Sequence, residues 1–284
     1  MTRCNRAVLV ALVVVGCTHR PPPTVVFLSD FGTTDDSVAI CKGVMLGIEP
    51  RLRLVDLTHE VRPFAIADAA RLVAGTAPYY PAGTVFLAVV DPGVGGPRRA
   101  LAVLSGRGQY FVVPDNGLIT LVAARDGIRE ARELRADPAS STFHGRDVFA
   151  PAAARLAHDG RFADLGPVVA SPVRIAVDAP AVDERGLAGA VIGLDGPFGN
   201  LVTNVDAPAF HALGWQLGDT VPVTFGERTV RMPFVRTFGD VAVGDALLYV
   251  DSRGRLALAV NQGDFARRYG VVPPLALFIP RRPR

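Results

Sequence analysis

The sequence predicts an α/β protein, with an N-terminal doubly wound α/β domain followed by a smaller C-terminal all-β, barrel-like domain. In the first half, short β-branched apolar runs alternate with segments of helical periodicity, which is typical of a parallel sheet covered by helices. After about residue 171, short alternating runs separated by Gly and Pro turns replace the helices, which favours a small barrel. We therefore expect one domain over residues 24–170 and a second over 171–284.

Each element of the first domain has its own local signal. The run TVVFLS ends at Asp30 as a buried parallel strand would. Asp35, Asp36 and Ser37 offer N-cap chemistry for a helix that Pro50 stops. In the first domain the expected strands are 24–29, 52–57, 84–90, 100–104 and 110–113. Its expected helices run from the 35–37 cap to about 48, over 66–76 and over 148–158. In the second domain the expected strands are 173–177, 188–194, 220–225, 246–250 and 256–260.

The first 17 residues have the features of an export signal. Arg3 and Arg6 precede an unbroken apolar stretch over 7–16, which is too short to span a bilayer as a permanent helix. The end of this stretch, VVGC, resembles a bacterial lipobox, so we predict a lipoprotein signal peptide over 1–17 with lipidation at Cys17. The alternative is an ordinary secretory signal in which the cysteine occurs by chance.

The residues that follow predict where the chain is held. Residues 18–23 form a short tether stiffened by prolines, and lipid chains would keep the protein on a membrane surface without a spanning segment. Because Thr18, rather than Asp, follows the cysteine, we expect a cell-envelope protein on the periplasmic side of the outer membrane.

Charge and cysteine content exclude other classes. The chain carries 30 basic and 27 acidic residues, a formal charge of +3, and removal of Arg3 and Arg6 leaves 28 against 27, or +1. No basic stripe with interleaved aromatics remains, which argues against nucleic acid as a partner. Only Cys41 stays in the processed chain, so an internal disulfide is excluded, and its apolar surroundings favour a buried residue over a nucleophile.

Acids and glycines gather where two predicted strands end. One loop runs from Ser29 to Ser37 and another from Asp91 to Arg99, and ligands of α/β sheets bind beyond the carboxyl ends of strands. The first loop is acidic, unlike a phosphate cradle; carboxylates suit ribose hydroxyls, an ammonium group or a cation. Asp30 is the stronger functional candidate, whereas Asp35 and Asp36 taken alone are better explained as caps.

Other motifs carry weaker signals. His144 lies beside a glycine just before a predicted helix, and a lone histidine is usually structural. The segment Asp195–Asn200 is a turn by composition, and could equally be an aromatic-plus-amide site for a planar base. HExxH, paired cysteines, G-x-S-x-G and Walker loops do not occur, so we predict no metal site and no cofactor. The residues alone predict an α/β enzyme that binds a small polar ligand.

Six segments, in order along the chain, resemble the S-adenosyl-L-methionine (SAM) hydroxide adenosyltransferase family, relatives of the fluorinases and chlorinases. They are SDFGTTDDSVAICKG, DPGVGGPRR, PDNGLIT, TFHGRD, DGPFGN and NQGDFA. The resemblance runs from about Val25 to the C-terminus. It implies an N-terminal α/β domain, a C-terminal β-barrel-like domain, and a homotrimer whose active sites lie between subunits.

Residue identity separates the hydrolases of this family from the halogenases. The halide pocket of the halogenases has a Tyr and a Thr where this chain has Asp91 and Val94, and a Tyr and a small residue where it has His144 and Gly145. The hydroxide-transferring branch carries an Asp, an Arg and a His, which match Asp91, Arg98 and His144. The resemblance therefore implies attack of water on the ribose 5′ carbon of SAM, giving adenosine and methionine, with halogenation as an alternative.

The family also implies a substrate-binding set, with SAM or adenosine as the small-molecule partner. A Trp common in the halogenases is replaced at Phe64, and another at Val202. The alternative that is not an enzyme is a lipoprotein that binds adenosine or SAM without catalysis. It arises because SAM is made in the cytoplasm, whereas the predicted lipobox places this protein outside it. The implied contacts are Asp30 on the ribose hydroxyls; Asp35, Ser37 and Asp195 near the methionine part; Phe64 and Phe198 beside the adenosine; Asn200 on adenine; Ser252 and Arg253 on the methionine carboxylate; and Gln262 in the last motif.

Overall fold

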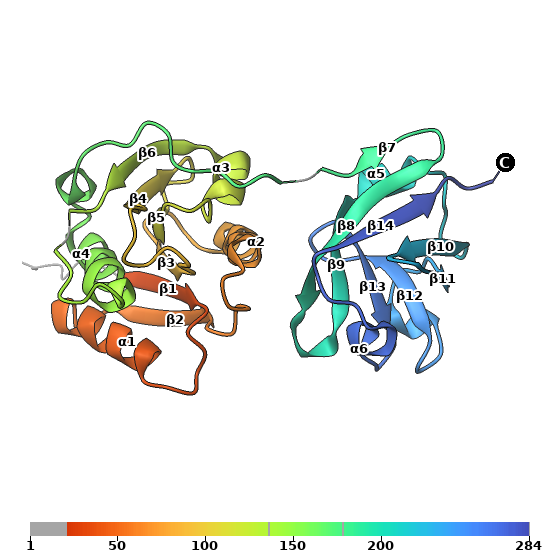
Figure 1. Ribbon diagram of the computed structural model, residues 1–284, viewed down its shortest axis with the longest axis horizontal. Helices are drawn as coiled ribbons and strands as arrows, with labels where there is room; N and C mark the ends of the chain where they lie inside the picture. Colours follow the sequence, from red (N-terminus) through yellow and green to blue (C-terminus); the bar gives the residue numbers. More distant parts are fainter. Residues whose placement is uncertain (1–21, 136, 178, 284) are drawn as a thin grey trace, which may run out of the picture.

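Two sheets, one in each half of the chain, organise the structure (Figure 1). The computed structural model describes residues 22–135, 137–177 and 179–283. The predicted signal peptide, its lipidation site Cys17 and all but the last two residues of the tether lie outside the described residues. Within the described part, no helix combines the length and the apolar character that crossing a bilayer needs.

The N-terminal sheet has six strands in the order β2-β1-β3-β5-β4-β6. Strands β1, β2, β3 and β5 are parallel, whereas β4 runs antiparallel to both β5 and β6. The five expected strands are present, and the sixth, β6, was missed because its sequence IREARE is polar and suits an edge strand. The bounds are β1 Thr24–Ser29, β2 Arg53–Thr58, β3 Val85–Val89, β4 Ala100–Ser105, β5 Tyr110–Pro114 and β6 Ile128–Glu133.

Helices cover both faces of this sheet, which confirms the doubly wound α/β prediction (Figure 1). Helices α1 (Ser37–Ile48) and α4 (Ala150–Asp159) pack together on one face, over the core that contains Phe27. Helices α2 (Ile66–Thr76) and α3 (Thr120–Asp126) cover the other. Because β1 and β3 are covered on both faces, the residues of β3 and the central residues 25–28 of β1 are apolar and buried. This burial fixes where each strand ends and where its loop begins.

The C-terminal domain is an antiparallel sheet that curls toward a barrel. Its order is β11-β10-β14-β8-β9-β13-β12, with β7 added beside β8. An isolated bridge between Phe234 and Leu248 joins the two ends of this order, so the sheet is almost closed. The bounds are β7 Ala181–Val182, β8 Gly186–Asp195, β9 Asn200–Asp206, β10 Thr220–Phe225, β11 Arg228–Pro233, β12 Ala246–Val250, β13 Arg255–Val260 and β14 Leu275–Pro280, with short helices α5 Ala207–His211 and α6 Phe265–Tyr269.

The strand expected at 173–177 is wrong. This segment links the two domains without joining either sheet. Its backbone donors bind side chains of the first domain instead: Val173 N–H donates to Asp115 Oδ1 at 2.7 Å, and Ile175 N–H donates to Thr120 Oγ1 at 3.0 Å. The apolar alternation at 173–177 therefore belongs to an extended linker on the surface of the first domain. These two backbone N–H groups are satisfied by side chains, so no strand pairing is needed.

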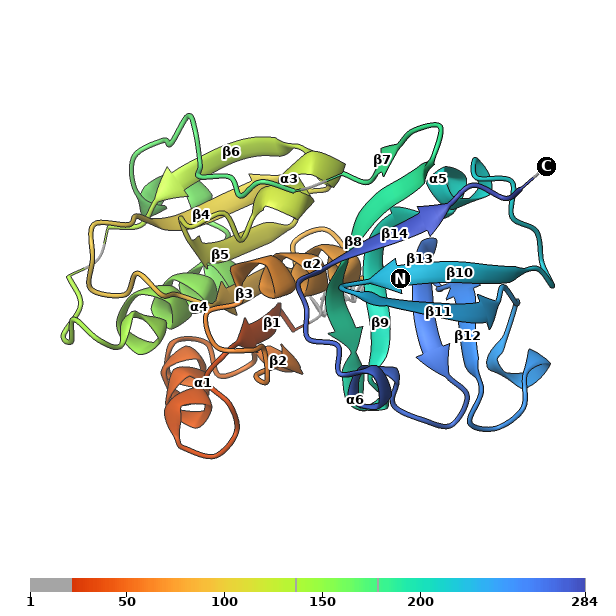
Figure 2. The ribbon, with the colours of Figure 1, turned by 45° about the vertical axis from the view of Figure 1, so that its right-hand side comes forward.

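The two domains also touch each other directly: α2 lies beside β8 (Figure 2), and side chains make contacts across the junction. The guanidinium of Arg62 donates to the carbonyl of Pro273 at 2.8 Å. Gly193 faces the guanidinium of Arg71, whose Nη2 would lie 2.9 Å from an added Cβ. Helix α2, which carries Arg71, therefore lies against β8 of the second domain.

Cys41 offers a direct check of the core. Its side chain is buried on α1, and burial raises the pKa of the thiol to about 12. At pH 8 the group therefore stays a neutral, unreactive thiol. In a variant carrying Cys4→Ser and Cys17→Ser, we expect no reaction with a disulfide reagent in the native state and full reaction of one thiol after denaturation. Rapid native labelling would contradict this packing.

Candidate active site

Strands β1 and β3 deliver two aspartates to one edge of the N-terminal sheet. They are adjacent and parallel, with Ser29 paired to Val89. Asp30 directly follows β1, and Asp91 follows β3 by two residues. Since parallel strands end at the same edge, both carboxylates lie on the ligand-binding side of an α/β sheet. The location predicted from the strand ends is therefore present in the structure.

Asp91, Arg98 and His144 form one hydrogen-bonded group, although His144 belongs to a motif about fifty residues after the one that contains Asp91 and Arg98. Arg98 Nε donates to Asp91 Oδ1 and Oδ2, at 2.9 Å each, and Arg98 Nη2 also contacts Oδ2. The same Nη2 donates to His144 Nδ1 at 2.8 Å. The Asp91 and Arg98 side chains are 6% and 11% exposed. The Arg98 guanidinium carbon lies over the Phe149 ring, 5.2 Å from its centroid.

The contact with Arg98 determines which nitrogen of His144 carries a proton. A guanidinium has donors and no acceptor, so Nδ1 must accept the bond from Nη2. The neutral imidazole then carries its proton on Nε2 and offers that N–H to a further group. Asp91, by contrast, offers only acceptor oxygens. The group thus presents one donor, on His144, and one anionic acceptor, on Asp91.

A π-helical turn over Gly145–Phe149 carries His144 at its start, directly before α4. Such turns interrupt the regular helical ladder and are frequent at functional sites. Gly145 lets this turn approach the first loop closely, because an added Cβ would lie 2.9 Å from the Phe31 ring and 3.3 Å from Phe143. The loop after β1 therefore supports the turn that holds His144.

Asp30 is engaged with the backbone of Phe64. Its Oδ2 accepts the Phe64 N–H at 2.9 Å. Phe64 has φ 66°, a left-handed conformation that is unfavourable for a bulky residue, and its side chain is 69% exposed. Among the described non-glycine residues, only Phe64 and Gln262 have positive φ, and both belong to the predicted binding set. Backbone strain of this kind clusters at functional sites.

Asp35 and Ser37 lie at the start of α1. Asp35 Oδ1 accepts the backbone N–H of Ser37 at 2.9 Å, while Asp36 occupies the N-cap position without a side-chain bond. This is the local turn chemistry expected for Asp35. Asp35 is exposed and Ser37 is partly exposed, at the end of the loop that follows β1 and carries Asp30, so the loop geometry is compatible with a ligand contact as well.

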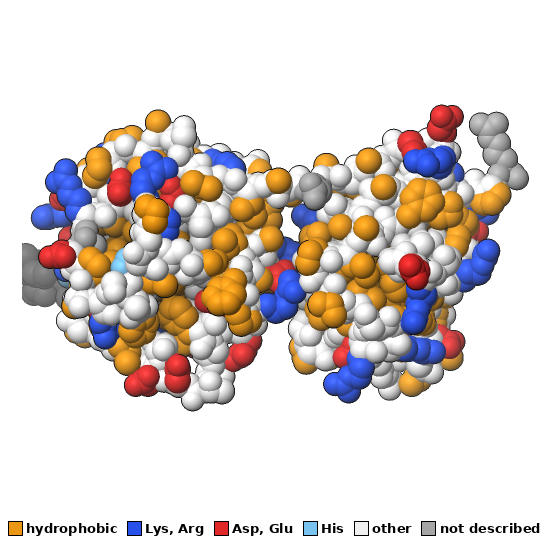
Figure 3. All heavy atoms as spheres, in the orientation of Figure 1, with side chains coloured by type: hydrophobic (Ala, Val, Ile, Leu, Met, Phe, Trp, Pro, Cys, Tyr) orange, Lys and Arg blue, Asp and Glu red, His pale blue; other side chains and the backbone are white. Residues whose placement is uncertain are grey.

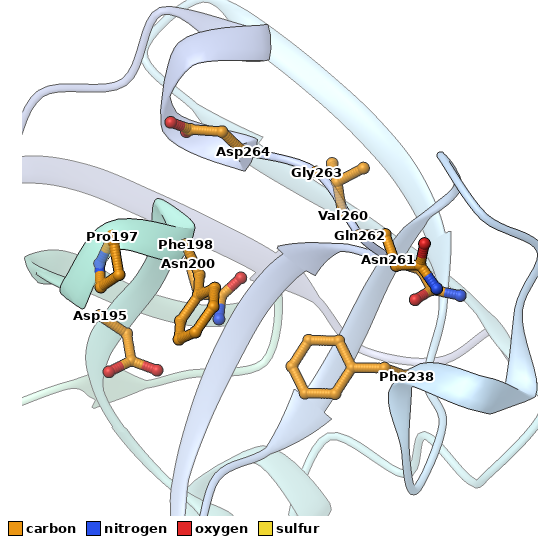
Figure 4. A pocket seen from close by; sticks show the side chains of 10 residues that line it. All are labelled: Asp195, Pro197, Phe198, Asn200, Phe238, Val260, Asn261, Gln262, Gly263 and Asp264. Carbon is orange, nitrogen blue, oxygen red and sulfur yellow. The ribbon is translucent and has the colours of Figure 1, made fainter.

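The predicted residues of the second domain share a cavity of about 640 Å³ (Figure 4). Four of them line it: Asp195, Phe198, Asn200 and Gln262. The Phe198 ring points into the cavity from the turn after β8, with the buried Asn200 amide beside it. An aromatic face next to an amide suits a planar heterocycle with hydrogen-bonding edges. The ten described residues of this lining all come from the C-terminal domain.

Phe238 is a lining residue that sequence reasoning missed. Its ring faces Phe198 across the cavity (Figure 4). A capping box formed by Thr237 and Asp240 fixes the short turn that presents it, and Tyr249 packs behind it at 5.0 Å between ring centroids. The available signal was the T-F-G-D segment, in which a capping pair encloses an exposed aromatic residue.

Ser252 and Arg253 lie outside this cavity. They belong to the turn between β12 and β13, and Arg253 lines a separate cavity of about 390 Å³ at the domain junction, together with Arg71, Arg125 and Arg255. Figure 3 shows basic side chains at the waist between the two lobes. Burial lowers the pKa of Arg71, Asp68 opposes this effect, and the charges of Arg253 and Arg255 add to the lowering. Arg125 is paired with Asp126 and Arg71 lies near Asp68, so Arg253 and Arg255 are the guanidinium groups of this cavity best suited to an anion.

Asp91, Arg98 and His144, here named the triad, lie in the N-terminal domain. The described residues that line the aromatic cavity all lie in the C-terminal domain and include none of the three. Within the described residues, no cluster of three or more His, Cys, Asp or Glu side chains is arranged to hold a metal ion. Chemically, the N-terminal group can orient and accept a proton from water, while the C-terminal cavity can hold a planar ring.

Comparison with known proteins agrees with this division. Residues 25–166 match the SAM hydroxide adenosyltransferase N-terminal domain, and residues 189–274 match the C-terminal domain of the same family. A relative from Salinispora tropica named (R)-S-adenosyl-L-methionine hydrolase is 42% identical, covering 89% of this chain and 96% of its own. A fluorinase from Actinoplanes sp. is 32% identical, covering 90% and 97%.

A solved structure has the same two-domain fold. It is an uncharacterised conserved protein from Thermotoga maritima, with a TM-score of 0.85 and 36% identity, covering 90% of this chain and 99% of that one. The resemblance inferred from the six motifs is thereby confirmed, as is the α/β plus all-β architecture. The chain belongs to the SAM hydroxide adenosyltransferase family.

Proposed function

We propose that this chain hydrolyses S-adenosyl-L-methionine to adenosine and L-methionine. The observation that carries the proposal is the position of Asp91. Its carboxylate follows β3 and is held by Arg98, and the same arginine also binds His144. Relatives named (R)-S-adenosyl-L-methionine hydrolase, at 42% identity over nearly their whole length, support it. A carboxylate at the nucleophile site repels a halide ion and accepts a proton from water.

The proposed step needs no cofactor. The water oxygen forms a bond to the ribose 5′ carbon as the carbon–sulfur bond breaks, and the electron pair of that bond returns to sulfur, giving the neutral thioether of methionine. Asp91 receives the proton that water loses. The N–H on His144 Nε2 donates to the same water and fixes its direction, and Arg98 fixes both side chains. Catalysis then depends chiefly on alignment of the water and exclusion of other nucleophiles.

Asp91→Asn tests the catalytic role. Asparagine keeps the shape and loses the anionic acceptor, so we expect kcat to fall about 10²–10⁴-fold, the range for an acid–base group. Adenosine release from both sulfur epimers of SAM is followed chromatographically, with chloride and fluoride present in parallel. Asp219→Asn, an aspartate paired with Arg282 at 2.9 Å elsewhere, is the matched control and should keep wild-type turnover.

The outcomes separate the rival functions. Undiminished hydrolysis by Asp91→Asn would remove Asp91 from the mechanism. Tight adenosine binding by the wild-type chain without methionine release would identify a binding protein, and a halogenated nucleoside would identify a halogenase.

We also propose a homotrimer in which the triad of one subunit faces the aromatic cavity of its neighbour. Support comes from the separation of the two sets between domains and from the exposed Phe64 and Phe198, at 69% and 65%, which an intersubunit ligand would cover.

Mixed assemblies test the shared site. Asp91→Asn and Asn200→Ala subunits each supply one defective half, so each homotrimer should be nearly inactive. Co-expressed and purified together, they should regain roughly a quarter of the sites by random assortment in a symmetric oligomer. Activity is compared with that of the two variants mixed after separate assembly without exchange. No recovery in the co-assembled sample would place each complete site within one chain.

Finally, we propose that the protein is lipid-anchored in the bacterial cell envelope, through Cys17. The lipobox-like segment VVGC and the proline-rich sequence that follows it support this. We expect Cys17→Ser to abolish labelling by a fatty-acid analogue in a Gram-negative host and to shift the protein to the soluble fraction, whereas Cys4→Ser leaves both unchanged. Labelling that survives Cys17→Ser would contradict the anchor.

A further inference from the structure

A chain of polar side chains lies behind the first loop, outside the proposed catalytic group. Lys42 Nζ donates to Asp56 Oδ2 at 2.7 Å, and Asp56 Oδ1 lies 3.1 Å from His59 Nε2. His59 Nδ1 lies 2.8 Å from Ser29 Oγ, which also accepts the Phe31 N–H at 3.4 Å. Ser29 and His59 are buried, at 0% and 5% exposure. The arrangement resembles a Ser–His–Asp triad, but a fully buried serine cannot reach a substrate.

The donors and acceptors of this chain have a single direction. The carboxylate of Asp56 can only accept, so the tautomer of His59 that satisfies this contact carries its proton on Nε2. Nδ1 then accepts the hydroxyl proton of Ser29, which leaves the Ser29 lone pairs free for the Phe31 N–H. Asp56 and Lys42 lie at the surface, with side chains 45% and 30% exposed, but the Ser29–His59 bond is buried, so water cannot replace a partner lost there.

The same histidine holds the loop a second time through its backbone. The carbonyl of His59 accepts the Gly32 N–H at 2.8 Å, and its neighbour Glu60 accepts the Thr33 hydroxyl at 2.8 Å. The Phe27 ring packs edge-on against the imidazole at 4.7 Å between centroids. Loop 29–33 is therefore fastened to the turn after β2 on both sides of Asp30.

We infer that His59 is a positioning residue for Asp30, acting through Ser29. Asp30 lies between Ser29 and Phe31, the two residues that share the Ser29 hydroxyl, and its carboxylate must reach both the Phe64 N–H and a ligand. Without the imidazole acceptor, the Ser29 hydroxyl has to turn elsewhere, and the peptide that carries Asp30 turns with it. The inference rests on the proposed function, since it assigns Asp30 to the nucleoside end of the substrate and Asp91 to the reaction.

Ser29→Ala in the full chain is the decisive variant. It removes the link and leaves His59, Asp56 and Lys42 in place. We expect KM for SAM and the Kd for adenosine to rise about 10- to 100-fold, the scale of a lost hydrogen bond to a charged group, with kcat changed less than about threefold. His59→Leu should act in the same way, and His59→Asn, whose amide can occupy the Nδ1 position, should recover most of the loss.

Ser105→Ala is the matched control. Ser105 is also fully buried at a strand end, and its hydroxyl also accepts a backbone N–H, from Gln109 at 3.3 Å. Because β4 is antiparallel to its neighbours, Ser105 lies at the opposite edge of the sheet from Asp30. We expect a similar fall in Tm for the two serine variants, with kinetics altered only in Ser29→Ala.

The results distinguish the two proposals. Wild-type KM and adenosine Kd in Ser29→Ala, with only Tm reduced, would overturn the positioning role and leave the hydrolase proposal intact. A fall in kcat without a change in KM or Kd would also overturn it, because the hydrogen bond between Ser29 and His59 would then act on the reacting group and not on Asp30. A wild-type chain that binds adenosine and releases no methionine would overturn the proposed function alone, because adenosine binding by the variants still tests His59.

Discussion

The guanidinium of Arg98 is the interaction on which the N-terminal site depends. It joins a carboxylate that follows β3 to an imidazole that precedes α4, two segments more than fifty residues apart in the sequence. Arginine suits this place because its planar fork serves two acceptors at once and has no acceptor of its own. The histidine is thereby limited to one tautomer, and the aspartate to one orientation. Lysine, with a compact ammonium on a flexible stem, could not impose both restrictions.

Around Arg98, the segments that carry the site residues are held together by close contacts that involve their backbones. Gly145 brings the turn that holds His144 against Phe31, and Phe31 shares the loop that carries Asp30. The loop is in turn fixed to the end of β2 through His59. Three strand ends and one π-helical turn thus form a continuous support. Such supports place functional groups more accurately than free loops can.

The sequence predicted the parts of the fold in which local pattern and burial agree. The buried middle of β1 and all of β3 are apolar because helices cover both faces, and the predicted strand ends placed Asp30 and Asp91 just after these strands, where the structure has them. The edge strand β6 and the extended linker at 173–177 were missed or misassigned, because an edge strand is polar and a linker can satisfy its backbone with distant side chains. These partners are not visible in a local pattern.

Prediction of the site shows the same division. Asp91 was suggested by its position, whereas Arg98 and His144 became candidates only through the family resemblance, since neither spacing nor residue type distinguishes them. Phe238 was missed because its role depends on how the barrel closes. The position of Arg253 beside Arg71 depends on how the two domains meet, which no local pattern encodes.

The left-handed backbone at Phe64 has a consequence for how this sequence can change. Glycine would adopt φ 66° without strain, so selection for stability alone favours Gly at this position. A glycine would keep the N–H that Asp30 accepts and would lose the exposed ring. Selection for stability and selection for ligand contact therefore favour different residues at position 64. An experiment that evolves the chain toward heat resistance without a demand for turnover should first lose the aromatic ring here.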